Sequence, residues 1–365
     1  MQLKLQKLEN VIFRVGPLRE QNGLYKDGKL IPSSKLSGRI NVAPDITDLS
    51  AKEHVSPPVF YLGPLYACWG NCITDNLKFL WPFINSSKHP EIANCKLAYS
   101  EVTLFGRGLP SNFFRILELL GIRRERLIKV SATTSFDCCY LADQCYIQDA
   151  ELGKNIATDE YWQIVDNICE HCVQTPEKTP EKIYFTRSKW HRWEYGEQSI
   201  ETAFQKAGFT IYSPENLSFD DMISILSHAK TFASTDGSCA HNSTFLKPGT
   251  ETILIRKFDF FDNKYQSCIN ETRPLNVQYI NAHCSFIFYD NNDKIGGPFF
   301  MYPSKELKNA LHTNAPFPLL DFFKYLAWGF ALHYGHLVGE FIRRHKSATT
   351  IKASQASQPT RKHLR

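Results

Sequence analysis

Short apolar runs alternate with stretches of helical periodicity in two parts of the chain. In the first part, the runs at residues 58–62, 95–100 and 126–130 are typical of strands, and the spacing of apolar residues predicts helices over 71–84 and 112–120. Gly121 follows the second helix, at a position where glycine commonly ends one. Strands that alternate with helices predict a parallel sheet in an α/β fold.

The second alternating part covers residues 182–258. Strands are predicted at 182–186, 209–213, 230–234 and within 247–258, and helices are predicted at 197–207 and 218–229. Ser218 is placed to cap the second helix, with Asp220 and Asp221 in its first turn. An alternation of about 75 residues is the usual size of a nucleotide-binding half-sheet.

The segments between and around these parts set the expected domain boundaries. Residues 150–176 are predicted to be helical, and the repeated Thr-Pro-Glu-Lys of residues 175–182 predicts a charged surface loop. The first 55 residues hold few apolar runs. We therefore expect an N-terminal α/β domain over residues 1–175 and a Rossmann-like domain over residues 176–315.

The most apolar late segment, residues 317–341, predicts a C-terminal helix within 316–345 that packs back on the body of the protein. Asp321, Lys324 and Glu340 interrupt it, so it is too short and too polar for a membrane-spanning helix. Its aromatic residues leave contact with a membrane surface as an alternative. Residues 346–365 are polar and basic and predict a disordered tail.

Composition narrows the class of protein. Of the 365 residues, 43% are hydrophobic and 22% are charged, which is typical of a globular chain with two cores. The net charge of +5 is too small to argue for nucleic acid, and a basic cleft for a phosphorylated small molecule would fit it equally well. The first residues lack the apolar core of a secretory signal, so the 11 cysteines are expected as reduced thiols in the cytoplasm.

Cys169 and Cys172 have the spacing of a metal-ligand pair, with His171 between them. A second pair of this kind is missing from the sequence, so we expect structural cysteines in preference to zinc. The sequence has no convincing Asp-x-Asp pair for a divalent cation, and Asp220 and Asp221 are predicted to be structural. No metal and no cofactor are therefore expected.

Residues 235–245, TDGSCAHNSTF, place small residues where a predicted strand ends. Ligands of open parallel sheets bind beyond the carboxyl ends of strands, and a helix that begins there offers free N–H groups. Gly237 and Ser238 would let phosphate oxygens approach the backbone, and His241 and Asn242 would add donors. The pattern predicts a diphosphate-binding turn. An ordinary strand-to-helix turn capped by Ser238 is the alternative.

A cationic segment follows another predicted strand of the same part. Its charged residues are Arg187, Lys189, His191, Arg192, Glu194 and Glu197. Cations at a strand end can pair with phosphates, and a carboxylate such as Glu197 can accept from ribose hydroxyls or pair with Arg192. A solvated loop with internal ion pairs is the alternative.

Together these segments resemble glycosyltransferase family 61, most of all its bacterial members in capsule and surface-polysaccharide loci. RSKWHRWEYGE, IETAFQKAGFTIYSPENLSF and ASTDGSCAHNSTFLKPGTETILI, in this order, are similar to the nucleotide-sugar half of the family. YLGPLYACWGNCITDNLKFLW resembles its N-terminal motif: Trp69 and Gly70 match, Asn71 stands where the family has histidine, and Asp75 matches the acid. The resemblance spans roughly residues 58–285.

The resemblance implies two Rossmann-like domains facing a cleft, the GT-B arrangement, with the acceptor on the N-terminal side. It also implies an inverting transfer from a nucleoside-diphosphate-sugar donor to an oligosaccharide or polysaccharide acceptor. Such a protein is expected in the cytoplasm, with peripheral membrane contact or other capsule-synthesis proteins as possible partners, and without nucleic acid.

An inverting transfer needs a base for the acceptor hydroxyl and stabilisation of the departing diphosphate. Asparagine cannot accept a proton at neutral pH, so Asp75 is the expected base and Asn71 would position the acceptor. The alternative for Asp75 is a carboxylate that only favours the helix dipole. The residues expected to bind the donor are Arg187, Arg192, Glu197, Gly237, Ser238, His241 and Asn242.

Two other classes of protein stay open. A degenerate transferase that only holds a nucleotide or a glycan would also lack the histidine at position 71, but the cationic segment and the Gly-Ser turn argue against it. An NAD enzyme is disfavoured, because no Gly-x-Gly-x-x-Gly follows a predicted strand.

Overall fold

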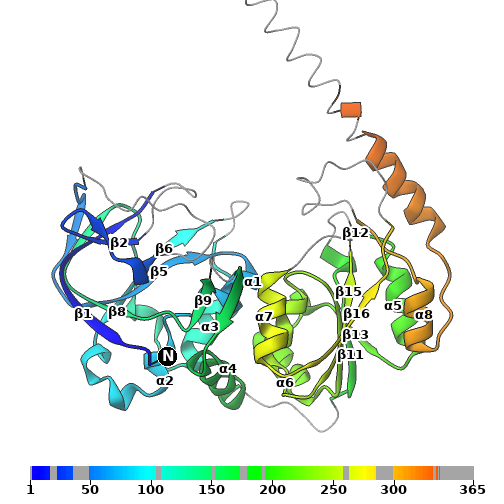
Figure 1. Ribbon diagram of the computed structural model, residues 1–365, viewed down its shortest axis with the longest axis horizontal. Coiled ribbons are helices and arrows are strands. Elements are labelled where there is room, and N and C mark those ends of the chain that lie inside the picture. Colours follow the sequence, from blue (N-terminus) through cyan, green and yellow to red (C-terminus); the bar gives the residue numbers. More distant parts are fainter. Residues whose placement is uncertain are drawn as a thin grey trace, which may run out of the picture. The chain divides into compact units, whose positions relative to one another are not determined.

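The computed structural model describes residues 2–16, 23–35, 49–103, 108–149, 153–172, 179–190, 194–257, 263–284, 299–331, 334–335 and 337. The chain forms two compact units: residues 1–186, 208–255 and 260–280 make the first, and residues 187–207, 256–259 and 281–365 make the second. The α/β class with parallel strands, predicted from the alternating pattern, is confirmed (Figure 1). The domain boundary near residue 175 stays a prediction.

The first unit contains an eight-stranded sheet of order β3-β2-β1-β8-β5-β6-β7, with β4 paired to β8 outside that path. Its strands are β1 (Leu5–Arg14), β2 (Gly23–Lys26), β3 (Lys29–Leu30), β4 (Glu53–Val55), β5 (Val59–Tyr66), β6 (Lys96–Val102), β7 (Leu127–Lys129) and β8 (Thr134–Ala142). The pairs β8–β5, β5–β6 and β6–β7 are parallel, whereas β1 pairs antiparallel with β2 and β8. The parallel core of this sheet contains the three strands predicted from residues 58–130.

The other main sheet has five strands in the order β13-β11-β14-β15-β16. Its strands are β11 (Lys182–Phe185), β13 (Thr210–Tyr212), β14 (Thr231–Thr235), β15 (Glu251–Arg256) and β16 (Asn276–Asn281). The pairs β11–β13, β11–β14 and β14–β15 are parallel. Along the chain, β13 follows β11 and lies on one side of it, whereas the next strand, β14, lies on its other side. The carboxyl ends of β11 and β14 therefore border a topological switch point.

Several helices of the first unit differ from the pattern in the sequence. The helices are α1 (Trp69–Thr74), α2 (Trp81–Ile84), α3 (Ser111–Leu119), α4 (Asp159–His171), α6 (Phe219–His228) and α7 (Lys264–Thr272). The single helix expected over 71–84 is divided, because residues 75–79 form a turn and Pro82 lacks the N–H that a continuous helix needs. Residues expected as the start of α4 instead form β10 (Lys154–Ala157), in a hairpin with β9 (Tyr146–Asp149).

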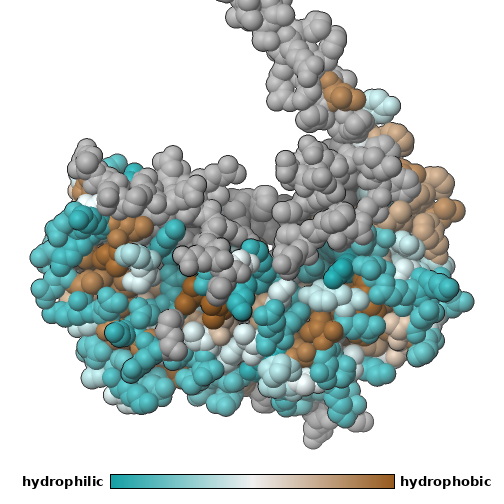
Figure 2. Space-filling view, viewed as in Figure 1, coloured by the Kyte–Doolittle hydropathy of each residue, from teal (hydrophilic) through white to brown (hydrophobic). Residues whose placement is uncertain are grey.

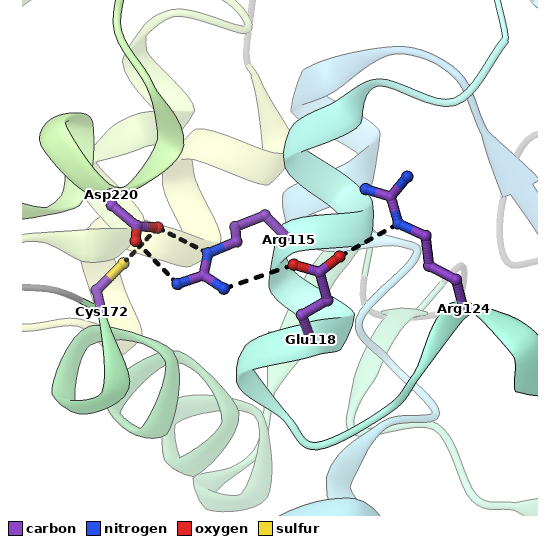
Figure 3. A network of polar contacts seen from close by, with 5 residues as sticks. All are labelled: Arg115, Glu118, Arg124, Cys172 and Asp220. Atoms are coloured by element: carbon purple, nitrogen blue, oxygen red, sulfur yellow. Dashed lines mark hydrogen bonds and ion pairs between the residues drawn. The ribbon is translucent and has the colours of Figure 1, made fainter.

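A polar network joins α3, α4 and α6 (Figure 3). Arg115 donates from Nε and Nη2 to the two carboxylate oxygens of Asp220, at 2.9 Å in each bond. Cys172, which follows α4, donates to the same carboxylate, and Glu118 accepts from Arg115 and Arg124. Asp220, predicted to be structural, therefore connects three helices. Apolar side chains from both sheets and these helices form one core cluster.

In the second unit, α5 (Glu197–Lys206) contacts α8 (Lys305–Leu311), and β12 (Glu194–Tyr195) pairs in parallel with β17 (Phe299–Phe300). Gly196 joins β12 to α5 with φ +84°, and a Cβ there would lie 2.0 Å from the carbonyl oxygen of Met301. This position therefore requires glycine.

Residues 319–331 of the second unit are helical and lie within the C-terminal helix expected over 316–345. The aromatic rings of Phe322 and Tyr325 pack on Phe300 of β17. Among the described residues, no helix combines the length and the hydrophobicity of a membrane span. The tail predicted over 346–365 lies outside the described residues.

Candidate active site

The turn after β14 is built around Gly237. Asp236, Gly237 and Ser238 are half-buried, and Gly237 has φ +111°, which residues with a Cβ rarely adopt. The Gly237 N–H donates to the Asp236 carboxylate at 2.7 Å. A Cβ on Gly237 would meet no atom within 4 Å, so backbone conformation and not crowding selects glycine here.

The helix expected after this turn is a six-residue 3-10 helix, η7 (Ala240–Phe245). Ala240 and His241 donate their N–H groups to the Gly237 carbonyl oxygen, and Asn242 donates to that of Cys239. The prediction of an α-helix that begins here with free N–H groups is therefore wrong. Packing decides this, since all six residues of η7 are buried and η7 contacts α1, α4, α6 and α7. A ligand at the turn would depend on Gly237, Ser238 and nearby side chains.

The start of α1 lies directly against this turn. A Cβ on Gly70 would lie 2.8 Å from Nδ1 of His241 and 2.9 Å from Oγ of Ser238, so the close approach requires glycine. Trp69 Nε1 donates to Asn242 Oδ1 at 2.9 Å, and Asn242 Nδ2 donates to the Cys239 carbonyl oxygen at 2.8 Å. Trp69 and Gly70 thus dock α1 on residues predicted to hold the donor, and Asn242 uses its amide in this contact.

His241 is oriented by Asn263, a residue that sequence patterns did not single out. Asn263 caps α7 by accepting the Gln266 N–H at Oδ1, and its Nδ2 lies 3.1 Å from Nε2 of His241. Nε2 therefore accepts, and the neutral imidazole carries its proton on Nδ1, the atom beside Gly70. This tautomer presents a donor on the side of the Gly-Ser turn.

Asn71 and Asp75, one helical turn apart, meet as their spacing predicts. Asn71 Nδ2 donates to Asp75 Oδ2 at 2.6 Å, and the Thr74 hydroxyl donates to the same oxygen at 3.2 Å. Asp75 is 2% exposed, and its Oδ1 is buried with no hydrogen-bond partner among the described residues. Burying a carboxylate oxygen without a donor is costly, so Oδ1 lacks the stabilisation that Oδ2 receives from Asn71 and Thr74.

Lys78 is a buried cation that follows α1, and the sequence analysis did not identify it. It is 1% exposed, and its Nζ has no hydrogen-bond partner among the described residues. Burial lowers the pKa of Lys78 to about 8, whereas the charge of Asp75 acts to raise it. Asp75 and Lys78 therefore lie within electrostatic reach of each other. The sequence did contain a signal for this buried cation, namely a lysine inside the apolar run LKFL.

The cationic segment belongs to the second unit. The Arg187 backbone N–H donates to Glu197 Oε1 at 2.9 Å, and Glu197 is 1% exposed. The Arg187 guanidinium lies 3.6 Å from Glu194, which also pairs with Lys257. Burial alone would raise the pKa of Glu194, but Lys257 and Arg187 hold it below its usual value.

The segment thus contains internal ion pairs, and Glu197 orients the Arg187 backbone. The roles of Arg187 and Glu197 toward a donor stay predictions. Arg192 and His191 lie outside the described residues.

Cys169 and Cys172 face different partners. The Cys169 thiol points to the Phe245 carbonyl oxygen, and the Cys172 thiol donates to Asp220. Burial raises the pKa of both thiols to about 12, so both are protonated at neutral pH. In the part of the chain that the structure describes, no three His, Cys, Asp or Glu side chains are grouped to hold a metal ion.

Comparison with known proteins identifies the family. The Glycosyltransferase 61 family model matches residues 65–253, which is 189 of the 365 residues. No curated protein matches the chain. Among solved structures, the chain is similar to a dodecameric iron-containing heptosyltransferase, TibC, in complex with ADP-D-beta-D-heptose. The two chains are 10% identical, and the match covers 81% of this chain and 82% of TibC. The TM-score is 0.27, which is too low to support an argument about fold or function. The family model covers more than half of the chain and contains the residues from Trp69 to Asn242; the chain belongs to glycosyltransferase family 61 and is a glycosyltransferase.

Proposed function

We propose that this protein is an inverting glycosyltransferase that acts in the synthesis of capsular or other surface polysaccharide. It would move a sugar from a nucleoside-diphosphate-sugar to an oligosaccharide or polysaccharide acceptor. The main support is the turn at Gly237 and Ser238, which follows β14 at the switch point of the five-stranded sheet and contacts Gly70. This contact joins the predicted donor turn to the motif that contains Asp75.

The proposal includes the GT-B arrangement of two Rossmann-like domains, with residues 1–175 on the acceptor side. It also includes action in the cytoplasm, at the inner face of the membrane, together with other capsule-synthesis proteins. The contacts within the first unit support only the part that concerns the Gly-Ser turn and α1.

The proposed reaction is a single displacement at the anomeric carbon of the donor. The acceptor oxygen bonds to this carbon while the bond to the diphosphate oxygen breaks, and the diphosphate leaves with the bonding electron pair. Asp75 takes the hydroxyl proton through Oδ1, and Asn71 orients the carboxylate by donating to Oδ2.

The charge that grows on the diphosphate is stabilised by positive and polar groups. Ser238 and the Nδ1–H of His241 would donate at the turn after β14. Arg187 comes directly after Thr186, which follows β11 at the other border of the switch point, and Arg192 lies further along the same segment. Glu197 would take the ribose hydroxyls. Because cations supply the compensating charge, we propose that the transfer proceeds in the presence of a metal chelator.

A nucleotide screen followed by a transfer assay tests the proposal. A nucleoside diphosphate or its sugar should raise the melting temperature by mass action, and the matching donor should lose its sugar to an acceptor or to water. Binding without any transfer or hydrolysis would favour a degenerate, nucleotide-holding protein. The absence of both binding and turnover across the panel would refute the donor site.

Arg187→Ala should weaken binding of the nucleoside diphosphate by about 1.5–3 kcal/mol, the range for hydrogen bonds to charged groups. Calorimetry measures this change. Lys189→Ala is the matched control, because it removes an exposed cation of the same segment. Equal affinities of wild type and Arg187→Ala would leave Arg187 with only its ion pair to Glu194.

Gly237→Val should abolish donor binding, because valine cannot adopt φ +111° without moving the turn. Gly208→Val is the control for general strain: Gly208 has φ +83°, and a Cβ there would also meet nothing within 4 Å, but it follows α5 and lies outside the proposed site. Both variants should lose stability in thermal melts, and only Gly237→Val should lose the nucleotide in calorimetry. A folded Gly237→Val protein that still binds would exclude the turn as the diphosphate site.

A further inference from the structure

The large hydrophobic side chains that are exposed in the described residues all lie in one segment of the second unit. They are Phe317, Leu319, Leu320, Phe323, Trp328, Phe330, Tyr334 and Leu337, with exposed fractions from 43% to 69%. We call these residues the apolar face. Figure 2 shows brown surface over the helix that Figure 1 draws in orange. Single exposed apolar residues are ordinary, but eight of them between positions 317 and 337 indicate an interaction surface.

The helix of residues 319–331 is apolar on two sides. Tyr325, which is 3% exposed, and Phe322 face Phe300 of β17. Leu319, Phe323 and Phe330 follow one another at intervals of four and seven residues, which aligns them on a different stripe. The fold of the second unit therefore uses one side of the helix and leaves the stripe with Phe323 uncovered by the described residues.

Cations border the apolar face. Lys305 and Lys308 of α8 line a hollow of about 710 Å³ together with Tyr302 and Phe317, the first residue of the apolar face. Along the sequence, residues 341–365 follow this face and contain no Asp or Glu but seven cations: Arg343, Arg344, Lys346, Lys352, Arg361, Lys362 and Arg365. An apolar helix face followed in the sequence by a polybasic segment is the combination that holds peripheral proteins on anionic bilayers.

We propose that the apolar face docks on an anionic lipid bilayer. The helix would lie in the plane of the interface, with Phe323 and Phe330 among the acyl chains and Tyr334 at the headgroup level. Lys305 and Lys308 would meet lipid phosphates. A second copy of the chain is a poorer occupant, because each copy has a net charge of +5 and the two copies would repel each other. This inference names the surface for the action at the inner face of the membrane that the proposed function includes, and it rests on that part of the proposal.

Vesicle sedimentation with the full chain tests the proposal. The protein should pellet with vesicles that contain phosphatidylglycerol, and should bind at least about tenfold more weakly to vesicles of phosphatidylcholine alone. Raising the salt from about 0.1 M to about 0.5 M should weaken binding to the anionic vesicles, since the electrostatic part is screened. No pelleting with anionic vesicles would overturn the proposal.

Phe323→Glu/Phe330→Glu should lower the vesicle affinity by about tenfold or more, because two carboxylates would enter the interface. Gln198→Glu/Gln205→Glu adds the same charge at exposed positions of α5 and should bind as the wild type does. Unchanged pelleting of the phenylalanine variant would overturn the proposal. The proposal would also be overturned if sedimentation velocity showed a dimer of the wild type and a monomer of the Phe323→Glu/Phe330→Glu variant. Nucleotide affinity should be equal in all these variants, which separates this test from that of the donor site.

Discussion

Asp75→Asn is expected to lower the rate of glycosyl transfer about a hundred- to ten-thousandfold, the usual effect of removing a general base. The asparagine keeps the shape of the side chain, and Asn71 can still donate to its carbonyl oxygen. Only the capacity to take a proton is lost. Initial rates with a true acceptor measure the effect, and calorimetry should show an unchanged nucleotide affinity, because Asp75 is assigned to the acceptor and not to the leaving group.

The control for lost charge is Asp159→Asn, which removes an exposed carboxylate from the first turn of α4 and should leave the rate as it is. Near-normal turnover in Asp75→Asn would rule out Asp75 as the base. Asn71→His restores the residue that the family motif has at this position. A large gain in rate from this change would indicate that the ancestral base was the histidine and that this chain is a weakened or redirected transferase.

Strands buried inside the parallel sheets could be predicted, because both of their faces are covered and they form continuous apolar runs. All eight residues of β5 are buried, and the run at 58–62 marks its start. β1 lies in the N-terminal segment, which has few apolar runs, and it was not predicted. It pairs with antiparallel strands, and only Val11 and Phe13 of its ten residues are buried. Its alternation of charged and apolar residues is the weaker signal of a half-exposed strand.

In the candidate site, contacts between residues close in the sequence could be predicted, and contacts between distant residues could not. The meeting of Asn71 with Asp75 follows from helical spacing alone. Trp69 and Asn242 are 173 residues apart, and their hydrogen bond depends on the packing of η7 between helices. Spacing arguments do not reach such pairs, which is why the role of Gly70 in the approach to Ser238 emerged only from the structure.

Lys78 offers a test of the charge balance around Asp75. In the unfolded chain its pKa is the ordinary 10.5, and in the folded chain burial lowers the pKa to about 8. Between these values the unfolded chain binds more protons, so the free energy of unfolding gains a contribution that rises with pH from about 8 to 10.5. Below pH 8 both states hold the proton, and the buried charge destabilises the fold by a constant amount.

Lys78→Met keeps the length of the side chain and removes the titration. The difference in unfolding free energy, wild type minus variant, should therefore rise by about 2–3 kcal/mol between pH 7 and pH 10. Chemical denaturation at several pH values measures it, and the tyrosines and cysteines that titrate in this window largely cancel because both proteins contain them. Lys88→Met, at an exposed position, is the matched control for the change of a lysine to methionine. In the Asp75→Asn background the rise should begin at a lower pH, because the carboxylate that raises the pKa of Lys78 is gone. A flat difference for Lys78→Met would mean that Lys78 keeps an ordinary pKa in the folded chain and does not act as the buried counter-charge of Asp75.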